Sequence, residues 1–186
     1  KTKELGGEYE SWGADLRTAC KSATKFGSLE EKDKPNIEGD DRNWRLWPED
    51  LWKLSEIHKK QSYLDVKGQY DLFDNFRATL WVMREKKSSI ITGVLWRSVW
   101  SSAPNGIIPK FITEKDGFGH AFKVFGWKEI NEEPYLIAQL SNGENFGDKG
   151  KFYFPRTVVN KEFTFGAYTF SDMPVEEAKQ KGWSFW

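Results

Sequence analysis

Residues 119–127 read GHAFKVFGW, and residues 135–150 read YLIAQLSNGENFGDKG. Each stretch holds a short run rich in apolar and aromatic side chains that is bounded by glycine or asparagine. Such runs predict two β-strands, Ala121–Trp127 and Tyr135–Gln139. The second strand leads directly into a segment rich in Gly and Asn, which is typical of a turn-forming loop. The two stretches therefore predict a pair of strands followed by a glycine-rich loop.

The same kind of pattern continues through the second half of the chain. Gly, Asn and Pro turns separate three further predicted strands, which are Ser89–Trp96, Lys151–Phe154 and Phe165–Phe170. Before these strands the apolar residues recur at helical spacing. Three helices are predicted there, the first from Asp15 to Phe26, the second from Pro48 to Lys60 and the third beginning near Asp71. Helices followed by strands indicate an α+β fold, with residues 1–87 mainly helical and residues 88–186 an antiparallel β lobe.

The composition restricts the possible partners. The chain has 186 residues, which fits one domain or two small lobes. Its 28 basic and 28 acidic residues give zero net charge, so neither nucleic acid nor an acidic membrane surface is an expected partner. No apolar run is long enough to span a bilayer. Two histidines and one cysteine indicate neither a metal site nor a cofactor site.

The single cysteine and the first residue suggest where the chain works. One cysteine excludes an internal disulfide, which favours an intracellular location or a particle assembled inside a cell. The sequence begins with Lys1 and shows no signal peptide, so we expect either processing or a longer precursor.

The spacing in the second half resembles the C-terminal part of the papain-like cysteine peptidases. In that family a Gly-His-Ala opens a strand that ends in Gly and an aromatic residue, as at 119–121 and 126–127 here. A second strand then leads into Asn-Ser-Trp-Gly, two spacer residues, Trp-Gly, two more residues and Gly. The positions that match this pattern without gaps are Ser141, Gly143, Gly147 and Gly150, with Phe146 in place of the second Trp. The resemblance covers about residues 13–170, is strongest over residues 117–154, and implies a papain-like fold.

The resemblance also implies a chemistry, which this sequence carries only in part. A cysteine thiol is mostly protonated at its free pKa, so the family uses a histidine to take its proton and an asparagine to orient the imidazole. His120 occupies the histidine position, but Leu140 replaces the asparagine and Asn142 replaces the tryptophan that shields it. The family's Gln and its Cys-bearing helix have no counterpart in these 186 residues.

Three residues require a choice between a functional and a structural interpretation. His120 could be a working acid–base group, a remnant of one, or an ordinary histidine. Cys20 lies on the apolar stripe of the first helix, where a free cysteine behaves as a small hydrophobic residue rather than a nucleophile. Asn142 could replace the missing asparagine, but a shift of two residues moves a side chain by roughly 6–7 Å. We therefore expect Asn142 to be a turn residue.

Several functions remain compatible with these observations. In the first hypothesis the chain is a degenerate, non-catalytic domain that serves as a structural or interaction component of an assembly. In the alternative it is the C-terminal fragment of a processed protease whose Gln and Cys lie on an upstream fragment. An aromatic-rich carbohydrate-binding module would explain the tryptophans but not the glycine spacing.

The expected partner is another protein or an upstream fragment. It would cover the face normally occupied by the nucleophile helix, around His120, Trp127 and Phe146. Two groups of aromatic residues are further candidates for contact with a partner: Trp81, Trp96 and Trp100, and the tail Trp183, Phe185 and Trp186.

Overall fold

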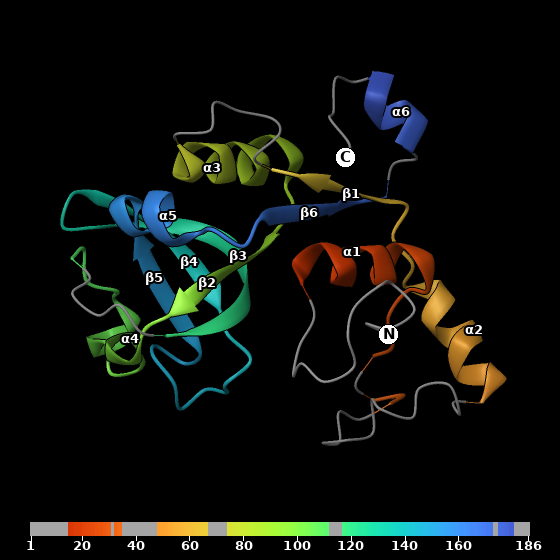
Figure 1. Cartoon of the computed structure of the whole chain (residues 1–186), viewed down its shortest axis with the longest axis horizontal. Coiled ribbons are helices and arrows are strands. Elements are labelled where there is room, and N and C mark those ends of the chain that lie inside the picture. Colours follow the sequence, from red (N-terminus) through yellow and green to blue (C-terminus); the bar gives the residue numbers. More distant parts are fainter. Residues whose placement is uncertain are drawn as a thin grey trace.

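The computed structural model describes residues 15–30, 32–34, 48–66, 74–111, 117–172 and 175–180 (Figure 1). Three predictions fall wholly or partly on other residues. Most of the long loop predicted between the first two helices, the beginning of the third helix near Asp71, and the aromatic tail lie outside the described residues.

The three predicted helices are present, with adjusted ends. Helix α1 (Leu16–Lys25) begins after Asp15, whose carboxylate accepts a hydrogen bond of 3.0 Å from the backbone N–H of Thr18. Such a cap satisfies one of the free N–H groups of the first turn. Helix α2 (Glu49–Ile57) follows Pro48. Helix α3 (Asn75–Lys86) is capped in the same way as α1, by Asp74.

Six antiparallel strands form one sheet in the order β1-β6-β2-β3-β4-β5. The strands are β1 (Ser62–Asp65), β2 (Ile90–Trp96), β3 (Phe118–Ile130), β4 (Glu133–Gln139), β5 (Lys151–Pro155) and β6 (Ala167–Ser171). The five predicted strands are confirmed, and β1 is an addition. The α+β class is therefore confirmed.

Further helical segments lie between the strands of the second half or after the last of them, and the sequence did not predict them. They are α4 (Ser98–Ser101), a 3-10 turn η3 (Pro104–Gly106), α5 (Arg156–Glu162) and α6 (Val175–Gln180). Helix α5 lies next to α3 on one side of the sheet (Figure 1). The side chain of Asn160 joins these two helices, because its Oδ1 accepts the backbone N–H of Phe76 at 2.8 Å.

The core lies where β2–β5 meet α3, α4 and α5. Trp96 is its centre, with ring centroids 5.1 Å from Phe152 and 5.4 Å from Trp100. Both tryptophans are buried, and Trp81 is half-buried against the same core, so the cluster predicted as a partner surface belongs to the interior. Edge-to-face contacts of this kind add to the free energy gained from burial alone.

The two halves of the sequence share the sheet. Strand β1, from the first half, pairs with β6 from the second, and α1 contacts β1, β2 and β6. The domain boundary near residues 86–88 stays a prediction.

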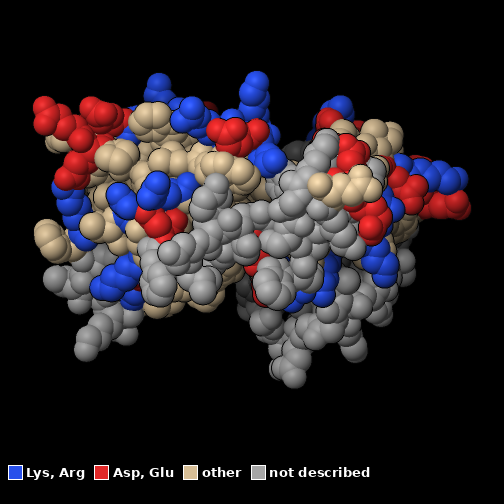
Figure 2. All heavy atoms as spheres, turned by 90° about the horizontal axis from the view of Figure 1, so that it is seen from above, with Lys and Arg blue, Asp and Glu red and all other residues tan. Residues whose placement is uncertain are grey.

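On the described surface, basic and acidic side chains are interspersed (Figure 2), in agreement with the zero net charge.

Candidate functional site

His120 is the third residue of β3 and lies opposite Val94 of β2. Its imidazole is half-buried among aromatic rings, with centroids 5.6 Å from Trp96 and 6.0 Å from Phe118. The Nε2 atom is buried, and it has no hydrogen-bond partner among the described residues. A buried polar atom without a partner carries a desolvation cost, which disfavours protonation of the ring.

Asn142 is the residue that reaches His120. The last pair of β3 and β4 is Lys123 with Gln139, and Asn142 lies three residues after this pair, as His120 lies three residues before it. The side chain of Asn142 hydrogen-bonds to the imidazole and raises the pKa of His120. Burial has the larger, opposite effect, and the pKa of His120 therefore lies below its ordinary value. The imidazole is thus mainly neutral at neutral pH.

The interpretation of Asn142 as a turn residue is compatible with its place in the structure. Asn142 lies in a turn, because the following Gly143 has a φ of 90°. Its role as a replacement for the missing asparagine stays a hypothesis.

Leu140 lies one residue beyond the end of β4 and is only 4% exposed. Its backbone N–H donates to the carbonyl oxygen of Gly150 at 3.0 Å, so the ladder with β5 continues through it. The side chain of Leu140 is a hydrocarbon and cannot hydrogen-bond to an imidazole.

The glycines of the loop have a structural explanation. Gly147 has a φ of 63°, and a Cβ at this residue would lie 2.5 Å from the carbonyl oxygen of Lys151 and 2.7 Å from the ring of Phe152. Gly150 has a φ of 79°, and its Cβ would lie 2.5 Å from Nε2 of Gln139. Larger residues would therefore disrupt this loop, whatever its chemistry.

Cys20 is buried on α1, as the sequence predicted. Burial, with a smaller contribution from the charge of Asp15, raises the pKa of the Cys20 thiol to about 12. The groups that shift its pKa do not include His120, and those that shift the pKa of His120 do not include Cys20. The thiol is protonated at neutral pH and does not act as a nucleophile there.

The aromatic residues near His120 are not all those that we expected. Trp127 is 58% exposed, but it lies seven residues along β3 from His120, a distance of roughly 23 Å in an extended strand. Phe146 is half-buried against Phe152, with centroids 5.6 Å apart. The exposed aromatic residue beside the imidazole is Phe118, which is 57% exposed.

Phe165 is a second exposed aromatic residue near His120 that the sequence did not single out. An ideal Cβ on Gly93 would lie 3.2 Å from Cβ of Phe165 and 3.3 Å from the carbonyl oxygen of His120. A Cβ on Gly119 would meet open space. Phe118 and Phe165 thus both lie near His120, and Gly119 separates Phe118 from it along the chain. These three residues are called the rim below. The sequence held a signal for Phe118, which directly precedes Gly-His-Ala, but none for Phe165.

No group of three or more His, Cys, Asp or Glu residues in the described part of the chain is arranged to hold a metal ion. Within the same residues, none of the helices has the length and apolar character required to cross a bilayer.

The sheet and helices match those of several solved cysteine proteases. Xylellain, a cysteine protease from Xylella fastidiosa, superposes with a TM-score of 0.68 at 22% identity, covering 92% of this chain and 66% of xylellain. Digestive procathepsin L 3 of Tenebrio molitor larval midgut gives 0.70 at 16% identity, covering 91% of this chain and 52% of that protein. The clostridial cysteine protease Cwp84 gives 0.63 at 15% identity.

These similarities establish the fold. The chain has the fold of the papain-like cysteine proteases, as its glycine spacing predicted. It spans less than two thirds of the length of each of these structures. No protein-family model and no curated protein matches the sequence.

Proposed function

We propose that this chain is a non-catalytic papain-like domain that serves as a structural or interaction component of a larger assembly. The observation that carries this proposal is the burial of Leu140 at the position where papain-like peptidases have their orienting asparagine. The only thiol of the chain, on Cys20, is also buried and protonated. A thiolate–imidazolium pair therefore cannot form among these residues at neutral pH.

The rim supports a role in binding protein. Phe118 is 57% exposed and Phe165 is 50% exposed, and each lies near His120. Exposed aromatic residues that lie close together are typical of interaction sites. The structures with the same fold contain further protein beyond the portion that this chain spans. We infer that another chain, or an upstream part of the same precursor, packs against the rim.

A peptidase assay tests the catalytic half of the proposal. The purified chain should not hydrolyse fluorogenic peptides, and Leu140→Asn should not create turnover, because an orienting amide is of no use without a thiolate nucleophile. Hydrolysis that a thiol alkylator abolishes would contradict the proposal.

The interaction half is tested at the rim. The double variant Phe118→Ser and Phe165→Ser should bind less of an environment-sensitive hydrophobic dye and should lose any co-purifying protein. The matched control is Phe111→Ser, which removes an aromatic ring that is 87% exposed but does not belong to the rim. Native mass spectrometry of the parent chain should show a bound chain or fragment. A monomer with no dye binding would leave the rim without a function.

The alternative, a fragment of a processed protease, is favoured by one observation. The imidazole of His120 is neutral and hydrogen-bonded by Asn142, a state suited to accepting a proton from a thiol. Co-expression with the protein segment encoded upstream tests this alternative. Thiol-dependent hydrolysis by the co-purified pair, lost in His120→Ala, would favour the protease over the non-catalytic domain.

A further inference from the structure

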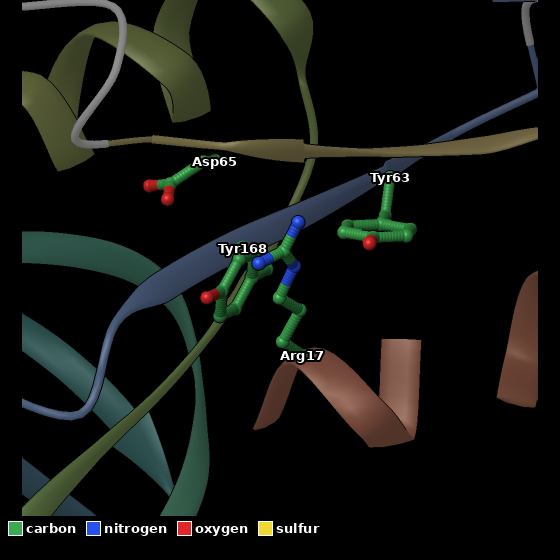
Figure 3. Close-up of a pocket in the computed structure, with 4 residues that line it drawn as sticks. All are labelled: Arg17, Tyr63, Asp65 and Tyr168. Carbon is green, nitrogen blue, oxygen red and sulfur yellow. The ribbon is translucent and has the colours of Figure 1, made fainter. Parts of the chain in front are cut away.

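A pocket of about 220 Å³ lies between α1 and the strands β1 and β6 (Figure 3). Its lining residues are Arg17, Tyr63, Asp65 and Tyr168. The guanidinium of Arg17 hydrogen-bonds to the hydroxyl of Tyr63, and Asp65 also interacts within the chain. The charged groups of this pocket therefore have partners within the protein, and they help to hold α1 against the sheet.

A different chemistry lies in the loop after β4. The dipeptide Asn-Gly occurs twice in the chain, at 105–106 and at 142–143. Asparagine is a thermolabile residue, and in such a pair it can deamidate without an enzyme. The backbone nitrogen of the glycine loses its proton and attacks Cγ of the asparagine, the side-chain amide leaves as ammonia, and a cyclic imide forms. Water then opens the imide and leaves an aspartate or an isoaspartate. Glycine favours the attack because it has no Cβ to obstruct the approach.

The pair at 142–143 is open to this reaction. Asn142 and Gly143 are both exposed, and a Cβ on Gly143 would meet open space. The N–H of Gly143 donates no hydrogen bond to another residue that the structure describes. The attacking nitrogen therefore has no native bond to break before it approaches Cγ of Asn142.

The pair at 105–106 is held in place, although Asn105 is exposed as well. The N–H of Gly106 donates to the carbonyl oxygen of Ala103 at 3.0 Å, and Gly106 is buried. An ideal Cβ on Gly106 would lie 2.3 Å from the carbonyl oxygen of Lys151, which shows how closely the backbone is packed there. Attack on Asn105 requires this hydrogen bond to break and the turn to open.

The neighbour of Asn142 is His120. The side chain of Asn142 hydrogen-bonds to the imidazole, and the bond favours the protonated ring. A protonated ring can only donate, so the amide oxygen of Asn142 is the acceptor. A hydrogen bond to this oxygen stabilises the negative charge that develops on it when a nitrogen attacks Cγ. The contact with His120 therefore assists the reaction.

We propose that Asn142 is a site of spontaneous deamidation, at which the chain acquires a negative charge beside His120. The reaction consumes water, releases ammonia and replaces the amide by a carboxylate. In the unmodified chain, burial and the amide of Asn142 shift the pKa of His120, and no charged side chain of the described residues contributes. A carboxylate near the ring favours the imidazolium. The deamidated chain thus holds a pair of opposite charges in place of a neutral imidazole and an amide. The proposal is independent of whether the chain is catalytic and of any partner at the rim.

The two Asn-Gly pairs allow an internal comparison. The intact chain is incubated at mildly alkaline pH, and timed samples are digested and analysed by mass spectrometry for the conversion of each asparagine. In the folded chain Asn142 should be converted at least about fivefold faster than Asn105, since the loss of one hydrogen bond alone has an effect of that size. In denaturant the two rates should become similar, because the dipeptides are identical.

The effect on His120 is tested with a variant that carries the product. Asn142→Asp should raise the pKa of His120 above that of the parent chain, as an NMR pH titration of the ring protons measures. The matched control is Asn145→Asp, which places the same charge on an exposed residue of the same loop and should raise this pKa less. The proposal is overturned if Asn142 in the folded chain is converted no faster than Asn105, or if Asn142→Asp does not raise the pKa of His120.

Discussion

The side chain of Asn142 is hydrogen-bonded to the imidazole of His120, two residues beyond the position at which papain-like peptidases carry their orienting asparagine. The bond favours the protonated ring, and burial disfavours it more strongly. Removal of the amide leaves the effect of burial without opposition. Asn142→Ala should therefore lower the pKa of His120 further, which an NMR pH titration of the ring protons measures.

The control for this titration is Asn145→Ala, which removes the same chemical group from an exposed residue of the same loop. It should leave the pKa of His120 where it is. Equal pKa values in the parent chain and in Asn142→Ala would show that the amide has no influence on the imidazole.

The thiol of Cys20 should be almost inert in the folded chain. Its pKa is raised to about 12, so the thiolate that alkylating reagents attack is scarce at pH 8, and the side chain is 1% exposed. Iodoacetamide should modify the native protein far more slowly than the protein in denaturant, as mass spectrometry of timed samples will show. Rapid modification without denaturant would mean that α1 opens readily or that the thiol is accessible.

Trp96 should contribute more to stability than any exposed tryptophan. It is 1% exposed, contacts three other aromatic rings of the core, and donates from Nε1 to the hydroxyl of Ser101 at 3.0 Å. Trp96→Ala should lower the free energy of unfolding by about 3–5 kcal/mol. Trp127→Ala, at a residue that is 58% exposed, should change it by less than about 0.5 kcal/mol. Urea denaturation followed by circular dichroism distinguishes these outcomes.

Arg97 and Glu162 form an ion pair of 2.8 Å in which each side chain is only 10% exposed. Loss of one partner leaves a buried charge without its counterpart, which costs about 3–5 kcal/mol in other proteins. Glu162→Gln should therefore destabilise the fold by an amount in that range. Lys161→Gln removes only a longer contact of 3.9 Å from an exposed lysine to the other oxygen of Glu162, and it should have a much smaller effect. If the two variants unfold at the same urea concentration, the ion pair does not stabilise the fold.

Much of the fold could be predicted because local signals and tertiary structure agree. The capped helix begins after Asp15 as its sequence indicates, and the predicted strands Ala121–Trp127 and Tyr135–Gln139 fall within the longer β3 and β4. Helix α5 was missed because its sequence, RTVVNKE, contains two adjacent valines, which favour strands over helices. Strand β1 has only four residues, and its pairing partner lies far away in the sequence. Tertiary contacts therefore decide both elements.

Spacing alone was enough to propose His120 and Leu140 as site residues, and their roles stay predictions. The effect of Asn142 on His120 arises beyond the last pair of β3 and β4, so the sequence did not indicate it. The rim was missed because Phe165 approaches His120 from a segment more than forty residues away, through the gap left by a glycine at 93.

The pairing of β1 with β6 also restricts when this chain can fold during synthesis. Ser62 pairs with Ser171, about 110 residues later, so β1 has no strand to join until nearly all of the sheet has been translated. At roughly 5–20 residues per second, that interval lasts several seconds or more. Throughout it the apolar residues Leu64 and Val66, each 1% exposed in the folded protein, remain without their native contacts on β6. The nascent chain therefore lacks, for that interval, contacts that bury these apolar residues in the finished protein.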